Sequence, residues 1–260
     1  MERMRFGDIA IVGERREGLV FGFTERGGGV SKPPYESLNL GPHVGDDIAC
    51  VYENRHRVLC AMGAQEHAER LLVPNQVHGD TVVTVSSNEP DAIERSRSRI
   101  AAGADAIVCT APGVPVMLCF ADCVPVILTC GNNAFAVVHS GWRGTLARIS
   151  AKAARALAKA AGGQMSDICA YIGPHILGNE YQVSPDLIET FSLQFATIEN
   201  TASRMLDLSA CIVTSLEEIG VSPCAIHDLQ LSTVAQNDRF FSYRQEKGTC
   251  GRHAAVAALL

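Results

Sequence analysis

The stretch from residue 103 to residue 145 constrains the fold of this chain more than any other part of its 260 residues. It contains four short apolar segments, at 104–109, 116–120, 124–130 and 134–138, separated by Pro, Gly and Asn. Segments of these lengths with turn residues between them are typical of strands. The sequence therefore predicts a buried β-sheet at the centre of the chain.

Two polar side chains, Cys123 and His139, interrupt this apolar pattern where strands are expected to end, and His78 stands in a similar turn. Two His and one Cys form a ligand set of the kind that catalytic zinc uses, with a fourth position open for water or substrate. Long stretches of chain separate the three, so only the fold can bring them together. Asp105 and Asp122 are candidate acceptors for the ring N–H of a ligating His. In the alternative interpretation, Cys123 is a core cysteine and both His are ordinary loop residues.

Composition excludes several classes of protein. The net charge is −6, the charged fraction is 19% and no run of Lys or Arg occurs, so a nucleic-acid partner is not expected. No segment has the pattern of a secretory signal or a membrane span, which predicts a soluble, cytoplasmic protein without a membrane partner. Ten scattered cysteines without a C-x-x-C motif read as small buried hydrophobes in a reducing compartment. Small-molecule partners fit this composition, and the chain can be a monomer or a homodimer.

The remaining segments mix strands and helices without regular alternation. Strands are expected at 9–12, 19–23, 71–73, 81–85, 168–172, around 225 and at 254–260. Helices are expected at 48–61, 146–161, 185–195 and 206–219, while 86–102 reads as a surface linker or short helix. This order predicts a mixed α/β fold of the α+β type, a single layered domain over residues 1–260 with mixed β-sheets flanked by helices. The long loop at 24–45 is a candidate functional segment.

Two further segments have the character of binding sites. Residues 141–145 lead from a strand into a helix, where free N–H groups and Arg143 would suit a phosphate; a tight turn with a surface Arg is the alternative. The run from Phe240 to Arg244 could stack a planar base and hold an anion; an aromatic edge of the core is the alternative.

Short motifs spread over nearly the whole chain match one known family in order. They are SLNLG at 37–41, HVGDD at 43–47, NR at 54–55, QVHG at 76–79, ADCVPV at 121–126, HSGWRG at 139–144, IGP at 172–174, FSYR at 241–244 and GR at 251–252. With these motifs the chain resembles the YfiH-like family, also called the polyphenol oxidase or multicopper laccase-domain family. Its members are described as purine nucleoside phosphorylases.

The resemblance implies a single-domain layered α/β fold and a catalytic zinc held by His78, Cys123 and His139. It implies phosphorolysis of adenosine, inosine and S-methyl-5′-thioadenosine to the free base and a ribose 1-phosphate, which keeps the 5-methylthio group in the last case. It also implies deamination of adenosine to inosine, and therefore a purine nucleoside and phosphate as partners.

Roles for individual residues follow as expectations. In the deaminase reaction a zinc with one open position would activate water for attack at C6 of adenine, and Asp122 is the candidate acid for the departing amine. Phosphorolysis needs a phosphate held beneath C1′ of the ribose. The residues expected around phosphate, sugar or base are Arg143, Gly141, Gly144, Arg55, Arg252, Tyr243 and Arg244.

Three other functions remain open. A His2Cys set with Met117 as a weak axial ligand would suit copper and a polyphenol oxidoreductase, although eight His are few for a multicopper oxidase. Cys123 as nucleophile with His139 as base would make a hydrolase or amidase, acting for example on cell-wall precursors. A binding or scaffold protein with a structural zinc would need a fourth ligand, for which Cys119 and Cys130 are the candidates.

Overall fold

The strands of the chain form two sheets. The computed structural model describes residues 1–260. One sheet is antiparallel, with the order β1 (Glu2–Phe6), β2 (Ile9–Arg16), β3 (Leu19–Thr24), β11 (His253–Leu259) and β6 (Val116–Phe120). The other is mixed, with the order β10 (Ile226–Asp228), β9 (Ile168–Ile172), β7 (Val124–Cys130), β8 (Phe135–Ser140), β5 (Ala106–Cys109) and β4 (Val82–Val85). The predicted mixed α/β fold is confirmed, and one of its two sheets is mixed, as expected, while the other is antiparallel.

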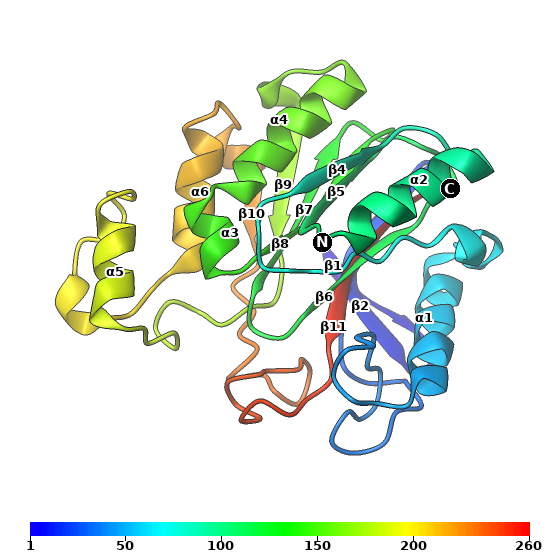
Figure 1. Ribbon diagram of the computed structural model, residues 1–260, viewed down its shortest axis with the longest axis horizontal. Helices are drawn as coiled ribbons and strands as arrows, with labels where there is room; N and C mark the ends of the chain where they lie inside the picture. Colours follow the sequence, from blue (N-terminus) through cyan, green and yellow to red (C-terminus); the bar gives the residue numbers. More distant parts are fainter.

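Helices cover the outer faces of both sheets (Figure 1). The α-helices are α1 (Ile48–Met62), α2 (Pro90–Ala101), α3 (Trp142–Leu146), α4 (Ile149–Ala161), α5 (Pro185–Ser192) and α6 (Leu208–Glu217). Short 3-10 turns follow as η1 (Gln65–Arg70), η2 (Met165–Asp167), η3 (Thr201–Ser203) and η4 (Pro223–Ala225). No helix combines the length and the apolar character that crossing a bilayer requires.

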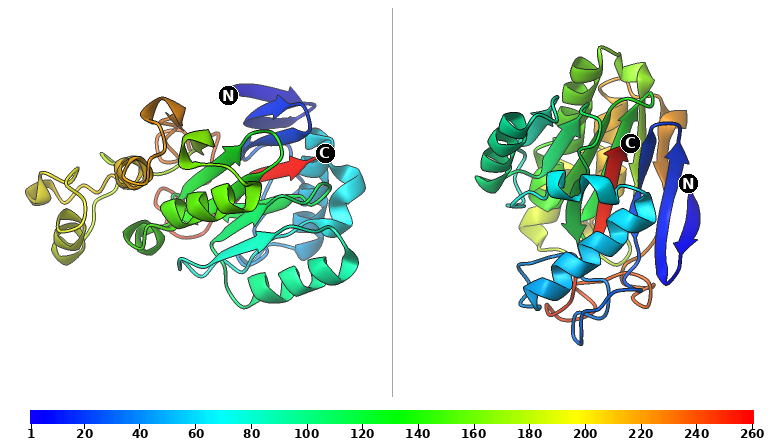
Figure 2. Two further views of the ribbon diagram at one scale, coloured as in Figure 1. Left: turned by 90° about the horizontal axis from the view of Figure 1, so that it is seen from above. Right: turned by 90° about the vertical axis from the view of Figure 1, so that its right-hand side faces the viewer.

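The two sheets pack face to face and give four layers, helix, sheet, sheet and helix (Figure 2). Alternate residues of one strand therefore enter different cores. Val137 points into the core between the sheets, whereas Val138 packs under α4 and α6. In the same way, Ala257 lies between the sheets and Val256 packs under α1. Because both faces are buried, these strands read as continuous apolar runs, and each fully buried Val, Ile or Phe stabilises the fold by about 1.5–3 kcal/mol.

The short helix that was one of the two possibilities for residues 86–102 is present as α2, which begins at Pro90, but it buries Ile93 and Ile100 instead of lying wholly on the surface. Three other predicted elements differ in the structure. The helix predicted over 146–161 is two helices, because Arg148 adopts a left-handed backbone with φ of 58°. The strand expected at 71–73 is reduced to one bridge between Leu72 and Val116. Helix α5 ends at Ser192. Strand β1 was not predicted, since its alternating charges are those of an edge strand.

Two long loops, 25–47 and 229–252, meet at one end of the sheets, at the bottom of Figure 1. Backbone bonds join them, from Arg26 N to Arg239 O at 2.7 Å and from Leu40 N to Arg252 O at 3.0 Å. The buried carboxylate of Glu25 also accepts from Arg3 and Arg239. Loops that would otherwise move independently are thus fixed at the edge where Cys123 and His139 lie.

Candidate metal centre

His78, Cys123 and His139 converge at this end of the sheets. One potential ligand atom from each lies within 4.8 Å of the others, and no other group of three His, Cys, Asp or Glu residues in the chain is arranged in this way. Sheet pairing explains the meeting of two of them, because Pro125 of β7 is opposite His139 of β8 and Cys123 directly precedes β7. The juxtaposition that the sequence predicted is present.

Asp105 brings the third residue into place. Its fully buried carboxylate accepts hydrogen bonds from the backbone N–H groups of Val77 (3.2 Å), His78 (3.0 Å) and Gly79 (2.7 Å). The same carboxylate lies 2.8 Å from Nδ1 of His139. These bonds hold His78 in its left-handed conformation, with φ of 59°, and leave Nε2 of His139 to face the site. Asp105, which the sequence offered as an acceptor for a ligating His, takes that position, and Asp122 does not.

Charge at the site favours a thiolate. Burial opposes ionisation of Cys123, yet His139 and His78 outweigh it and lower the pKa of its thiol to about 6. Burial also opposes protonation of His139, but the neighbouring Cys123 and Asp105 raise its pKa to about 9. Without metal, the pair is therefore a thiolate beside an imidazolium at neutral pH. A thiolate is the form of cysteine that binds zinc and also the form that acts as a nucleophile.

Gly141 and Gly144 make room for this centre. A Cβ on Gly141 would lie 3.1 Å from Sγ of Cys123 and 3.2 Å from Cδ2 of His78, and one on Gly144 would lie 3.1 Å from the Gly79 carbonyl oxygen. Both glycines therefore let α3 approach the centre closely. Neither lines the adjoining cavity, although Trp142 at the start of α3 does, and the anion pocket expected at this helix start stays a prediction.

A cavity of about 990 Å³ opens in front of the three residues. One part of its wall is cationic and contains His43, Arg55 and Arg252. Burial and the two nearby guanidinium groups lower the pKa of His43. Another part of the lining is apolar and consists of aromatic and aliphatic side chains, namely Phe120, Trp142, Ile176, Tyr181, Leu208 and Tyr243. The cavity thus combines a metal-type donor set, a region for an anion and a surface for a planar apolar group.

Asp122 lines the cavity but is occupied in another way. Its backbone is left-handed, with φ of 83°, and its carboxylate accepts from Thr233 Oγ1 at 2.7 Å and from the backbone N–H of Arg244 at 2.6 Å. Asp122 therefore fastens the segment with Tyr243 and Arg244 beside the cavity. This arrangement fits a positioning residue better than the proton donor that the sequence suggested.

Some of the other expected site residues line the cavity, and others lie outside it. Arg55, Tyr243, Arg244 and Arg252 line it. Arg143 does not, because its exposed guanidinium lies over the Trp142 ring, 4.4 Å from the centroid. Met117, considered as an axial ligand, packs in the apolar core under α1. Neither Cys119 nor Cys130 belongs to the metal-type cluster, so no fourth protein ligand closes it.

Six of the wall residues named above were not expected from the sequence, namely His43, Phe120, Trp142, Ile176, Tyr181 and Leu208. His43 and Trp142 stood in the quoted motifs without an assigned role, whereas Tyr181 had no signal, because it lies in an irregular segment far from those motifs. Gln76 also has a clear structural role. Its side-chain amide pairs with both backbone groups of Cys119 at 2.8 Å, which ties the His78 turn to β6.

Comparisons with known proteins agree with this geometry. Residues 20–260 match the family described as multi-copper polyphenol oxidoreductase laccase. The chain is 35% identical over 259 residues to a purine nucleoside phosphorylase of Streptomyces coelicolor, covering 96% of this chain and 100% of the relative. It is 32% identical over 240 residues to purine nucleoside phosphorylase YfiH of Escherichia coli, covering 90% of each. The solved structure of the Bacillus licheniformis hypothetical protein YfiH superposes with a TM-score of 0.87 at 28% identity, covering 98% of this chain and 97% of that one.

Proposed function

Because the chain belongs to the multi-copper polyphenol oxidoreductase laccase family, whose Streptomyces and Escherichia relatives are named purine nucleoside phosphorylases, we propose that it is a zinc-dependent purine nucleoside phosphorylase. It would cleave adenosine and inosine with inorganic phosphate to the free base and ribose 1-phosphate, and S-methyl-5′-thioadenosine to adenine and 5-methylthioribose 1-phosphate, in a purine-salvage role. The observation that carries the proposal is one cavity that joins the His78, Cys123 and His139 cluster to a cationic and an aromatic wall.

The three donors fit zinc. One thiolate and two imidazoles suit the borderline softness of this ion, and Asp105 completes the pattern of a carboxylate behind a ligating His. A zinc ion held there would supply a Lewis acid with a coordination position open toward the cavity. Three protein donors without a fourth favour a catalytic rather than a structural site.

The cationic wall is the place for phosphate. Arg55 and Arg252 are each partly bound to backbone carbonyl oxygens, Arg55 to Leu40 and Arg252 to Cys250 and Gly251. Their guanidinium groups are therefore held in place before a ligand arrives, which lowers the entropy cost of binding an anion. Phosphate positioned against them would attack C1′ of a ribose while the C–N bond to the base breaks.

The aromatic wall is the place for the purine. Trp142, Tyr181 and Phe120 offer ring faces and edges to a planar base. Burial, together with the nearby charge of Cys123, raises the pKa of Tyr181, so its phenol keeps its proton and can donate a hydrogen bond to a ring nitrogen. Deamination of adenosine at C6 is the second activity proposed, because the base and the metal-type cluster share this cavity.

One alternative rests on a specific observation. The thiolate and imidazolium pair of Cys123 and His139 is also the arrangement of a cysteine nucleophile with its base, as in a hydrolase or amidase acting on cell-wall precursors. A copper-dependent polyphenol oxidoreductase is less well supported, since Met117 lies in a different core and only one metal-type cluster is present.

Metal analysis and product analysis on the purified protein test the proposal together. We expect about one zinc per chain and phosphate-dependent release of adenine from adenosine, both lost in Cys123→Ala. Cys169→Ala is the matched control, because Cys169 is half-buried and lies outside the cavity. Activity that survives complete chelation but not thiol alkylation would replace the proposal with the cysteine-nucleophile alternative.

A further inference from the structure

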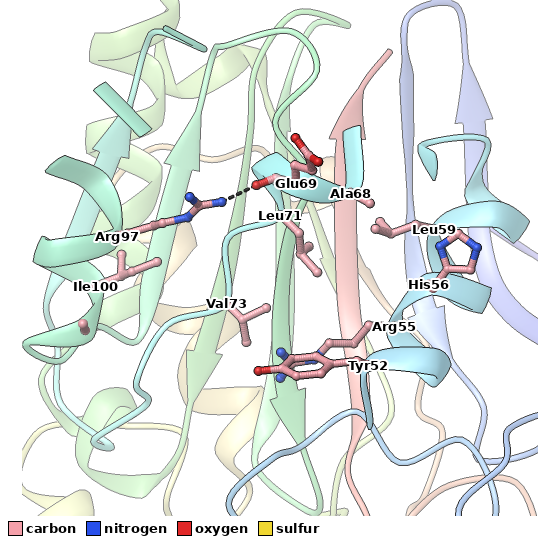
Figure 3. Close-up of a pocket in the computed structure, with 11 residues that line it drawn as sticks. Tyr52, Arg55, His56, Leu59, Ala68, Glu69, Leu71, Val73, Arg97 and Ile100 are labelled. Carbon is pink, nitrogen blue, oxygen red and sulfur yellow. Dashed lines mark hydrogen bonds between the residues drawn. The ribbon is translucent and has the colours of Figure 1, made fainter. Parts of the chain in front are cut away.

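A second cavity, of about 460 Å³, lies between α1, η1 and α2 (Figure 3). It adjoins the larger one, because Arg55, Val73 and Ala101 line both. Figure 3 shows Leu71 and Val73 between the side chains of α1 and those of α2. The second cavity, here called the side groove, is thus an outward continuation of the proposed nucleoside pocket past Arg55.

Much of the lining of the side groove is aliphatic. The aliphatic side chains of Leu59, Ala68, Leu71, Val73 and Ile100 line it.

Three of the polar side chains around the side groove have partners inside the protein, whereas the Tyr52 hydroxyl and the Glu69 carboxylate at its rim are free. Arg97 donates to the Glu69 carbonyl oxygen and lies 3.6 Å from Glu94, and Arg55 donates twice to Leu40 O. His56 Nε2 lies 3.5 Å from Cys60 Sγ. The aliphatic side chains of the groove offer water no hydrogen bond, so an apolar chain would displace water from them favourably.

We infer that the side groove is a subsite for an apolar 5′-substituent on the nucleoside, longer than a methylthio group, such as a butylthio chain. The inference rests on the proposed function. In the proposed function phosphate lies against Arg55 and Arg252, which line the large cavity, so the ribose that it attacks lies next to these two residues. C5′ is the ribose carbon that can carry a chain without loss of a ring hydroxyl, and Arg55 and Val73 mark the passage from ribose to side groove.

The lining argues against a charged 5′-substituent. A 5′-phosphate in the side groove would lie beside the Glu69 carboxylate, which repels it, and beside Arg55, which the proposed function assigns to inorganic phosphate. An aliphatic chain carries no charge for Glu69 to repel, and it gains apolar contact with Leu71 and Ile100. Each methylene buried in the side groove should tighten binding by about two- to four-fold.

The test compares adenosine with its 5′-deoxy-5′-methylthio and 5′-deoxy-5′-butylthio derivatives and with adenosine 5′-monophosphate. Calorimetric Kd and kcat/KM are measured for the wild type, Leu71→Gln, Ala68→Phe and Leu193→Gln. Leu71 and Ala68 line only the side groove, and Leu193 is 83% exposed and lines neither cavity, so Leu193→Gln repeats the chemical change elsewhere. Thermal unfolding of each variant shows that it is folded.

We expect the butylthio compound, which has three more methylenes, to bind the wild type at least about eight-fold more tightly than the methylthio compound. Leu71→Gln and Ala68→Phe should remove this advantage, leave adenosine within two-fold of the wild type, and differ from Leu193→Gln in doing so. A butylthio compound no better than the methylthio one, or tighter binding of the 5′-monophosphate, overturns the inference. Absence of base release from adenosine itself overturns the proposed function instead, and the Kd values still decide on the side groove.

Discussion

The carboxylate of Asp105 binds Nδ1 of His139 through the same oxygen, Oδ1, that accepts the backbone N–H of His78. The two histidines of the metal-type cluster are therefore positioned by one buried atom, although 61 residues of sequence, from 78 to 139, separate them. The second oxygen, Oδ2, accepts from Val77 and Gly79 and fixes the turn around His78.

Replacement of this carboxylate should weaken zinc binding by the cluster without removing any of its three potential ligands. An amide at Asp105→Asn presents an NH2 group either to the His78 turn or to His139, so at least one buried donor loses its acceptor. We expect zinc affinity to fall about 10- to 100-fold and the free energy of unfolding to fall by about 2–4 kcal/mol. Competition with a chelator measures the first and urea unfolding the second. Asp122→Asn is the control, and an equal loss of zinc affinity there would contradict the role given to Asp105.

Crowding at Gly141 gives a second prediction. The Cβ of Gly141→Ala would meet Cys123 Sγ at 3.1 Å and His78 Cδ2 at 3.2 Å, distances that force both side chains to shift. Zinc affinity should fall by about ten-fold or more, since ligands must stay near ideal positions. Gly27→Ala has no atom within 4 Å of the new Cβ and an ordinary φ, so it should leave both affinity and stability unchanged. Zinc content after dialysis against a weak chelator distinguishes the two variants.

The reactivity of Cys123 in the metal-free protein should follow its depressed pKa. Because the thiol pKa lies at about 6 instead of 9.0, Cys123 is largely thiolate at pH 7. Alkylation by iodoacetamide should therefore reach half its maximal rate near pH 6. The rate is obtained as the difference between the wild type and Cys123→Ala, which subtracts the other cysteines. Half-maximal alkylation near pH 9 would show that His139 does not stabilise the thiolate.

His253 predicts a pH dependence of stability away from the metal-type cluster. Its ring is fully buried between Phe120 and Phe240, and burial lowers its pKa to about 3 from 6.5, although the Pro174 backbone acts weakly in the opposite direction. The folded state thus keeps His253 neutral, while the unfolded chain takes up a proton below pH 6.5. Stability contributed by this residue is complete above pH 6.5 and declines as the pH falls from 6.5 toward 3.

His253→Phe should remove that decline because it removes the titrating group and keeps an aromatic ring. Between pH 7.5 and pH 5, the wild type should lose about 2 kcal/mol more free energy of unfolding than the variant. Urea unfolding at the two pH values measures the difference. Parallel losses in both proteins would mean that His253 is protonated or hydrogen-bonded in the folded state.

Periodicity and turn residues predicted much of the fold. The apolar runs at 116–120 and 124–130 are strands β6 and β7, because burial on both faces leaves no polar alternation. The break at Arg148 was not predictable from helix propensity. Its left-handed backbone is compensated by tertiary contacts, namely bonds to Ser215, Glu218 and the Gln194 carbonyl, which the local sequence does not contain.

The sequence predicted the three potential metal ligands of the candidate site, but only some of the residues that line its cavity. His78, Cys123 and His139 stand out because each is a potential ligand at the end of an apolar segment. Tyr181 reaches the cavity from an irregular segment, and a residue of this type has no local pattern that separates it from surface tyrosines. The role of Asp122 depended on two partners, Thr233 and Arg244, that are more than 100 residues away in the chain.

Arg55 and Arg143 give the last prediction, because the sequence placed both near phosphate and the structure separates them. Arg55 lines the large cavity beside His43 and Arg252, whereas Arg143 lies over Trp142 outside it. A hydrogen bond between a charged donor and a charged acceptor contributes about 1.5–3 kcal/mol, so Arg55→Ala should raise the KM for phosphate at least ten-fold. Arg143→Ala should change it less than three-fold, and the zinc content of both variants should equal that of the wild type. Initial rates of base release from inosine over a range of phosphate concentrations measure both values. A large increase in the KM for phosphate in Arg143→Ala, with a small one in Arg55→Ala, would indicate that phosphate binds at the start of α3 and not at the cationic wall. The proposed position of the ribose beside Arg55 would then also be wrong.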